Sequence, residues 1–239
     1  MILQDGMSGN VPVNSSLIQP ALERNSFCDS IFSFLLFLPI NQINSQIHSQ
    51  LLFCIVNSCA VEQKMTLAKK EIMKLSSKLF GSEDAGVKWH VAYIVERIMY
   101  SCAAFVPNSQ PNPQKQTFER EGLLTQLTRI VANANDIEQD VATVGASAIA
   151  IGHAYKATNH TDILANLFVR DLKTLLSNQN EKIVEKSLLL SGFLIALGSN
   201  TNKISLKQWI PVAVAQQLSL NQNKDISKNA GILLKLLIA

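Results

Sequence analysis

Few side chains in this sequence have the types and spacing that catalysis or metal binding requires. The best grouping is His153, His160 and Asp162, which flank one predicted turn and could together supply three metal ligands. The same residues also fit a histidine at a helix C-terminus, a turn histidine and an aspartate that caps the next helix. We favour this second interpretation, and we expect no metal site.

No motif for a catalytic or nucleotide-binding site is present. The patterns H-E-x-x-H, G-x-S-x-G, G-x-x-x-x-G-K-[ST] and G-x-G-x-x-G are all absent. The acidic pairs Glu119/Glu121 and Glu138/Asp140 are each separated by two residues, so their side chains diverge on a helix and read as solvated faces. The sequence therefore predicts no catalytic residues and no cofactor, and we expect the protein not to be an enzyme.

Two tryptophans are the best candidates for contacts with a partner. Trp89 follows Lys88, and Trp209 lies two residues after Lys207. Large aromatic residues beside basic ones are typical of interface anchors, although most tryptophans belong to a core. Trp89, Trp209 and Lys207 are the residues that we predict to bind a partner, with core packing as the alternative for both tryptophans.

The elements that would position these side chains repeat along the second half of the chain. Ile137–Gly152, Ile183–Gly198 and Ile226–Ala239 align at shifts of about 46 and about 43 residues, the length of a two-helix solenoid repeat. Before each of them comes a run with apolar residues at helical spacing and then a polar break rich in asparagine. We predict three helix pairs over residues 117–156, 160–198 and 204–239.

The second helix of each predicted pair is apolar on more than one face. Val144–Ile151 and Leu188–Leu197 are almost continuously apolar or small, whereas a surface helix shows only one apolar stripe. Such a helix must be covered on two sides, as an inner helix of a stack is. Glycine, alanine and serine in these runs would let neighbouring backbones approach closely. An ordinary compact helical bundle is the alternative.

At these residues the chain resembles HEAT and armadillo repeat proteins. The second helix of a HEAT unit often ends in an Ala-Leu-Gly-like step, which is similar to Ala150-Ile151-Gly152 and Ala196-Leu197-Gly198. The resemblance implies an all-α fold, an α-solenoid of stacked antiparallel helix pairs. It also implies a scaffold or adaptor that binds another protein along a helical-repeat surface.

The first half of the chain contains less regular helical segments. Residues 1–14 read as a disordered lead, and 15–106 as N-terminal helices that include a helix over 61–80 and another over 83–105. Val87, Val91, Ile94, Val95 and Ile98 would face inward on the second of these. Residues 107–116 contain three prolines and form a loop between the two halves.

The amino-acid composition indicates which classes of partner and which cellular location the sequence favours. Apolar residues make up 47% of the chain and charged residues only 16%, below the usual share of about 25%. Since the net charge is only +3, the sequence does not favour nucleic acid as a partner. The four cysteines form no C-x-x-C pair, so we expect reduced thiols and a cytoplasmic location, with the nucleus as an alternative.

Two apolar segments could contact a membrane or another protein. Phe27–Leu38 is too short to span a bilayer, which needs about 20 residues, so a membrane-associated helical protein is only an alternative reading. The C-terminal helix, residues 224–239, is apolar to its end. We expect this helix to pack on further repeats of a longer array or on a partner.

Overall fold

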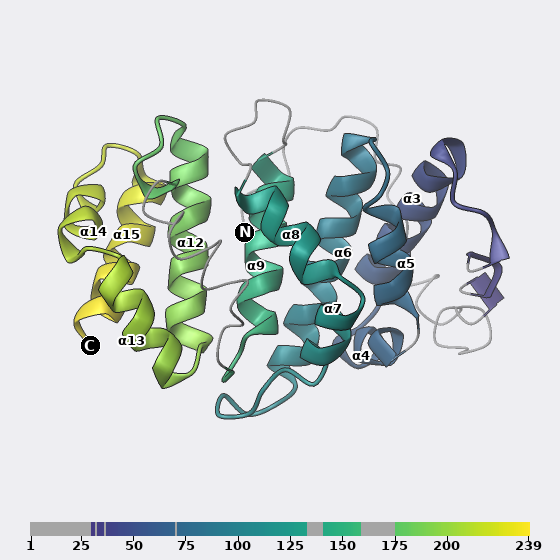
Figure 1. Cartoon of the computed structure of the whole chain (residues 1–239), viewed down its shortest axis with the longest axis horizontal. Coiled ribbons are helices and arrows are strands. Elements are labelled where there is room, and N and C mark those ends of the chain that lie inside the picture. The colour runs from purple at the N-terminus through teal and green to yellow at the C-terminus, as the bar shows by residue number, and fades with distance from the viewer. Residues whose placement is uncertain (1–29, 32, 36, 70, 133–140, 159–174) are drawn as a thin grey trace.

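The computed structural model describes residues 30–31, 33–35, 37–69, 71–132, 141–158 and 175–239, and every regular element in these ranges is a helix. Figure 1 shows these helices side by side along one long axis, in chain order. The predicted lead (1–14) lies outside the described residues. So do most of the predicted first helix of the 160–198 pair and the residues Glu138, Asp140, His160 and Asp162.

The described helices form successive groups. The array begins with α3 (Gln42–Ser58), followed by α4 (Val61–Lys69), α5 (Ile72–Leu79) and α6 (Ala85–Ala104). Next come α7 (Lys115–Arg120), α8 (Leu123–Ala132) and α9 (Val141–Ala154), then α12 (Glu181–Leu197), and finally α13 (Asn200–Trp209), α14 (Val212–Ser219) and α15 (Lys224–Ile238). The expected all-α solenoid is confirmed.

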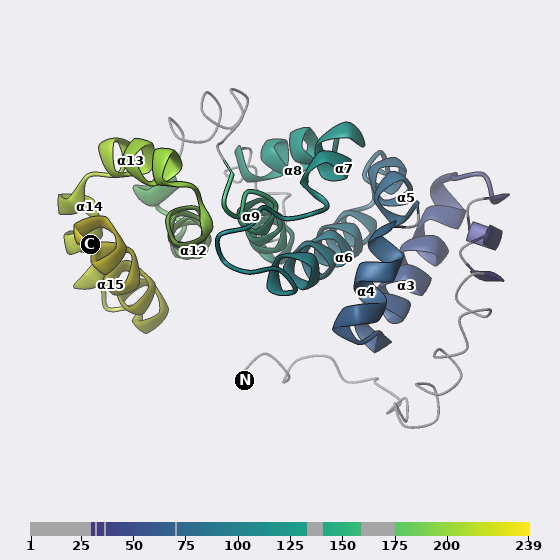
Figure 2. The ribbon, with the colours of Figure 1, turned by 90° about the horizontal axis from the view of Figure 1, so that it is seen from below.

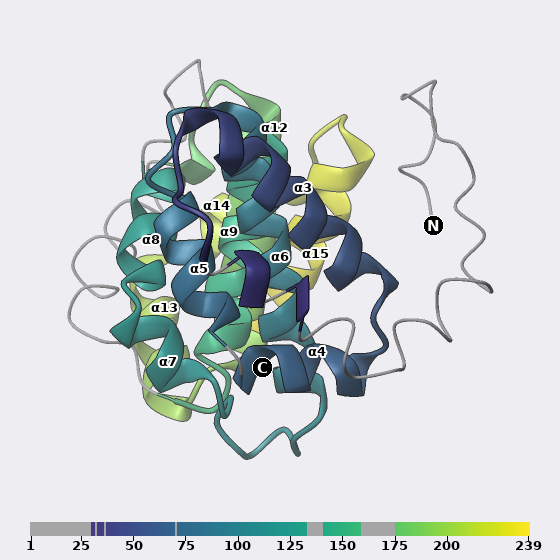
Figure 3. The same cartoon turned by 90° about the vertical axis from the view of Figure 1, so that its right-hand side faces the viewer.

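One helix of each group forms a continuous inner row. α3 packs on α6, α6 on α9, α9 on α12 and α12 on α15; we call these five the third helices. Figure 2 shows them along one edge of the array, with α7, α8 and α13 along the opposite edge, and Figure 3 shows the same two layers from the end. Because the middle three have neighbours on both sides, they can be apolar nearly all round, as their sequences predict.

In the three groups whose first part the structure describes, that part is two short helices. The predicted helix over 61–80 is divided into α4 and α5, both of which pack on α6. Gly122 (φ 75°) separates α7 from α8, and Pro211 separates α13 from α14. A left-handed glycine and a proline both interrupt a helix, so the chain bends at these positions. After these bends α8 packs on α9 and α14 packs on α15, whereas α13 packs on α12 of the preceding group.

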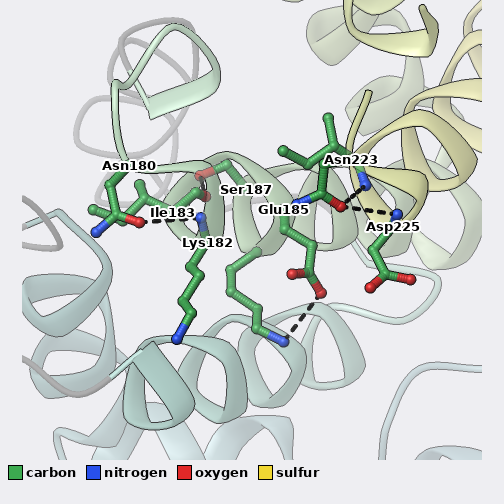
Figure 4. A network of polar contacts seen from close by, with 9 residues as sticks. Asn180, Lys182, Ile183, Glu185, Ser187, Asn223 and Asp225 are labelled. Atoms are coloured by element: carbon green, nitrogen blue, oxygen red, sulfur yellow. Dashed lines mark hydrogen bonds and ion pairs between the residues drawn. The ribbon is translucent and has the colours of Figure 1, made fainter. Parts of the chain in front are cut away.

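Asparagine caps recur at the N-termini of the last two third helices. The Asn180 Oδ1 atom accepts a hydrogen bond from the Lys182 N–H (3.1 Å), and the Asn223 Oδ1 atom accepts one from the Asp225 N–H (3.0 Å), as Figure 4 shows. Two residues earlier, Asn178 and Asn221 accept from the N–H groups of Asn180 and Asn223. The same turn is therefore built twice, about 43 residues apart.

Small residues within the third helices have two distinct roles. The buried Ser147, Ser187 and Ser191 each donate a hydrogen bond to the carbonyl four residues earlier, which satisfies their hydroxyl groups inside the core. The glycines were expected to let neighbouring backbones approach closely, but no described backbone outside their own helices lies close to Gly145 or Gly192. A Cβ atom at Gly145 would meet the side chain of Lys186, and one at Gly192 would meet nothing within 4 Å.

The predicted equivalence of Gly152 and Gly198 is wrong. Gly198 caps α12, and its N–H donates to the Leu194 carbonyl, whereas Gly152 lies inside α9. At that register the buried Ala150 would match the exposed Ala196. A shift of about 43 residues, as between α12 and α15, instead places Ala142 and Ile149, which are not buried, over the half-buried Glu185 and Gly192.

The proline-rich segment 107–116 is fixed to the helices on both of its sides. It connects α6 to α7, and most of its residues are exposed. Asn112 is nevertheless buried, and its Nδ2 atom donates to the carbonyls of Met99 and His153, each at 3.0 Å. Lys156, also buried, donates from Nζ to the carbonyls of Ala103 and Val106. Asn112 in this loop and Lys156 after α9 thus both link α6 to α9.

The early apolar segment Phe27–Leu38 is described only in part. Leu35 is fully buried, while Phe34 and Phe37 are exposed. Among the described residues, no helix is long and apolar enough to cross a membrane.

Candidate functional site

The interior helices α6 and α12 each leave one stripe of side chains at least partly exposed, and α9 between them leaves Ala142 and Ile149. We call this side of the row of third helices the third-helix face. On α6 the stripe includes Trp89, Tyr93, Arg97 and Tyr100, which are three or four residues apart. The remaining faces of α6 pack on α3, α4, α5 and α9. The predicted inward residues of this helix are all buried: Val87, Val91, Ile94, Val95 and Ile98.

Aromatic rings gather where α3 meets α6. The Phe53 ring lies 5.1 Å from Trp89, 5.0 Å from His90 and 5.0 Å from Tyr93, measured between ring centroids. We call these four residues the aromatic cluster. All four are half-buried, so each presents part of a ring to solvent and holds the rest against its neighbours. Tilted rings at these distances stabilise one another by about 1 kcal/mol per pair, which fixes the surface before any partner binds.

A group of charged residues, Lys64, Glu96 and Arg97, lies on one side of the aromatic cluster. The Arg97 guanidinium lies 4.7 Å from the centre of the Tyr93 ring, and its Nε atom is 3.3 Å from the Glu96 carboxylate. Burial raises the pKa of Glu96, while the charges of Arg97 and Lys64 oppose that rise. Burial and the Arg97 charge lower the pKa of Lys64 on α4. Arg97 therefore pairs with a buried carboxylate at this end of the face, and the charge of Lys64 acts on both residues.

An apolar groove lies at the other end of the face, between α12 and α15. Its volume is about 220 Å³, and its lining is almost entirely apolar. The lining residues are Leu188, Leu189, Gly192, Ala196, Asn229, Ile232 and Leu236. Since Gly192 has no side chain and α15 leaves open space above it, the groove can accept one aliphatic or aromatic side chain from outside.

The residues predicted to bind a partner do not come together. Trp89 belongs to the aromatic cluster on α6, whereas Trp209 and Lys207 lie on α13, in a different group of helices (Figure 1). Lys207 is half-buried, and the Trp209 side chain is outside the described part of the structure. Trp89 is therefore the one of the three that the structure places on the third-helix face.

The candidate metal ligand His153 is a core residue at the end of α9. It is buried, and its ring meets the Tyr100 ring edge-on at 5.2 Å between centroids. Burial, together with the charge of Lys156, lowers the pKa of His153 to about 4. Among the described residues, no group of three or more histidine, cysteine, aspartate or glutamate side chains could hold a metal ion.

The sequence interpretation missed most of the third-helix face. Tyr93, Arg97 and Tyr100 continue the helical stripe that Trp89 begins, so the spacing that predicted the inward residues also predicts these outward ones. Phe53 and the groove residues gave no such signal, because apolar side chains on an inner helix look alike whether they face a neighbour or solvent. Only the positions of α3 and α15 distinguish the two cases.

Comparisons with known proteins identify the fold. No family model matches the sequence, and no curated protein matches it. A designed armadillo repeat protein in complex with the peptide (KR)4 matches with a TM-score of 0.68 and 19% identity, over 94% of this chain and 87% of that one. Computationally designed armadillo repeat proteins for modular peptide recognition match with a TM-score of 0.64 and 16% identity, over 92% and 85%.

A crystal structure described as an engineered protein is similar too, with a TM-score of 0.65 and 16% identity over 94% of this chain and 84% of that one. At these identities the matches establish architecture. The chain has an armadillo/HEAT-like repeat fold, as the resemblance in its sequence implied.

Proposed function

We propose that this protein is a non-catalytic scaffold or adaptor that holds an extended segment of another protein along its third-helix face. The observation that carries the proposal is the surface itself, with an aromatic cluster at one end and an apolar groove at the other. Aromatic residues in partly desolvated positions supply most of the binding energy in many interfaces. Two structures of the same fold are described by peptide binding or peptide recognition, which supports this use of the face.

An extended peptide suits this surface because its successive side chains alternate in direction. A peptide that crosses the third helices can therefore place some side chains on the aromatic cluster and in the groove, while the others face solvent. The row of third helices is held rigidly by core packing, so little ordering of the protein opposes binding.

The test is selection of peptides from a random display library on the purified full-length chain. The peptides obtained are then titrated against Gly192→Leu, whose new side chain fills the groove, and against the control Gly231→Leu on α15. Neither glycine has an atom within 4 Å of its Cβ position. We expect groove-filling to weaken binding about tenfold, which corresponds to about 1.4 kcal/mol, with little change in the control.

Hydrogen exchange locates the bound peptide independently of the variants. Protection of α6, α9, α12 and α15 would support the proposal. Protection confined to α7, α8 and α13, or equal losses in both glycine variants, would contradict it.

A further inference from the structure

Arg97 is prepared for a ligand that the protein itself does not supply. The guanidinium stacks on the Tyr93 ring, and its Nε atom lies 3.3 Å from the Glu96 carboxylate without a hydrogen bond to it. Its side chain is still 42% exposed, and its two terminal amine groups make no hydrogen bond within the described part of the chain. A planar guanidinium held in this way presents paired donors that match the two oxygens of a carboxylate.

Lys64 adds a second cation to the same place. It lies on α4, which packs on α6, and its charge interacts with both Arg97 and Glu96. Among the described residues, no direct ion pair or hydrogen bond engages the Lys64 ammonium group. Since Glu96 is only 8% exposed, a partner would encounter the two cations rather than this carboxylate.

The rest of the third-helix face contains little exposed acid that could attract a basic segment. α3 and α9 contain no aspartate or glutamate. On α12, Glu185 lies 3.5 Å from the Lys186 ammonium, and Glu181 accepts a hydrogen bond from Asn223. Asp84, which caps α6 near His90, accepts hydrogen bonds from Gln46 and the Val87 N–H. Asp225, in the first turn of α15, is exposed. This distribution differs from what the (KR)4 peptide of the designed neighbour would require, because eight cationic side chains need anionic partners.

We propose that the segment bound by the third-helix face carries an aspartate or glutamate beside an apolar residue. Its carboxylate binds Arg97 and Lys64, and its apolar neighbour contacts the aromatic cluster. This inference rests on the proposed function and specifies the chemistry of the partner. The site discriminates against basic segments, because like charges would meet beside the aromatic cluster.

Synthetic peptides test this specificity directly. The probes are three repeats of Ser-X-Leu-Ser, with X as glutamate, glutamine or lysine, together with the peptide (KR)4. Fluorescence anisotropy on the full-length protein measures their affinities. We expect the glutamate peptide to bind at least tenfold more tightly than the glutamine peptide, and both basic peptides to bind most weakly. Raising the salt concentration should reduce this preference.

A pair of variants that each lose one positive charge tests whether the preference for glutamate depends on Arg97. Arg97→Gln should abolish the preference for glutamate over glutamine, because it removes the prepared donors. Arg129→Gln changes an exposed arginine on α8, at the opposite edge of the array, and should leave the preference intact. Circular dichroism of both variants serves as the control for folding.

The outcomes separate this inference from the proposed function. If the glutamate and glutamine peptides bind equally and both lose affinity in Gly192→Leu, peptide binding stands and carboxylate recognition is wrong. Equal loss of the preference in Arg97→Gln and Arg129→Gln would also overturn the inference, since it would indicate only a general charge effect. If no probe binds and no library peptide is selected, the proposed function fails as well.

Discussion

At the scale of single residues, burial decides which polar groups are structural and which can meet a partner. His153 and Asn112 are buried at the junction of α6 and α9, where Asn112 donates to two backbone carbonyls from adjacent groups of helices. Arg97 lies on the same helix as the Asn112 partner Met99, but its guanidinium is stacked and half-exposed. Two positions close together on α6 therefore differ in role: Met99 takes part in a buried structural contact, and Arg97 can contact a partner.

The buried His153 predicts a dependence of stability on pH. Its folded pKa is about 4, below the ordinary value of 6.5. The folded chain therefore favours the neutral ring, and this stabilisation is present above pH 6.5 and is lost as the pH falls toward 4. Burial also lowers the pKa values of His48 and His90, which act in the same direction. The raised pKa of Glu96 acts in the opposite direction.

Comparison with His153→Phe isolates this contribution, since phenylalanine retains an edge contact with Tyr100. We expect the loss of unfolding free energy between pH 6.5 and pH 4 to be smaller in the variant by roughly 2 kcal/mol. Urea titrations across this range provide the measurement. Identical pH profiles for the two proteins would show that burial does not hold His153 neutral.

At the scale of elements, short helices and their breaks set the shape of each group. Asp84 caps α6 by accepting the Val87 N–H at 2.9 Å, in the same way that asparagines cap α12 and α15. Gly122 marks the bend between α7 and α8, and its positive φ is a conformation that other residues adopt with difficulty. The bend thus depends on the identity of one residue.

Replacing Gly122 with alanine should destabilise the protein by about 1–2 kcal/mol, the cost of a left-handed conformation for an L-residue. No atom lies within 4 Å of the new Cβ position, so the effect comes from the backbone alone. Gly231→Ala is the control. Gly231 is helical, and there alanine should stabilise by up to about 1 kcal/mol. Thermal unfolding of the two variants should therefore shift in opposite directions, and a neutral Gly122→Ala would contradict the role given to this bend.

At the scale of the whole molecule, the stability of a solenoid depends on how well each group of helices packs on the next group. Lys156 follows α9 and donates hydrogen bonds to the carbonyls of Ala103 (2.5 Å) and Val106 (2.7 Å) at the end of α6. It therefore caps a helix of the preceding group, where a positive charge also favours the helix dipole. One side chain thus connects two groups that share the third-helix face.

Lys156→Met should weaken the junction of α6 and α9, because methionine keeps an apolar stem but leaves buried carbonyls without a donor. We expect a loss of about 2–3 kcal/mol in unfolding free energy. Amide hydrogen exchange should become faster at the end of α6 and the start of α7. Lys78→Met, at an exposed position on α5, should cause neither change. Unchanged exchange at residues 100–106 would show that the two groups are held together by apolar packing alone.

The repeating helical pattern was determined by the sequence itself. Apolar side chains at helical spacing predicted the inner helices, and asparagine at Asn180 and Asn221–Asn223 predicted the polar breaks where the caps are found. Gly122 and Pro211 also signalled the breaks in the first part of two groups, although one long helix was expected there. These features could be predicted because helix periodicity, capping and helix breaking are local properties of the chain.

Only the tertiary structure decided which apolar and aromatic residues face outward. Phe53 and Trp89 are 36 positions apart in the sequence, yet their rings are in contact. Leu189 and Ile232 lie on separate third helices, yet they line the same groove. Each pair comes together only because the third helices pack in a row. Similarly, the partners to which the buried Lys156 and Asn112 side chains donate are distant in the sequence. Contacts between distant segments depend on how the helices stack, so the candidate surface follows from the assembled array rather than from any one segment.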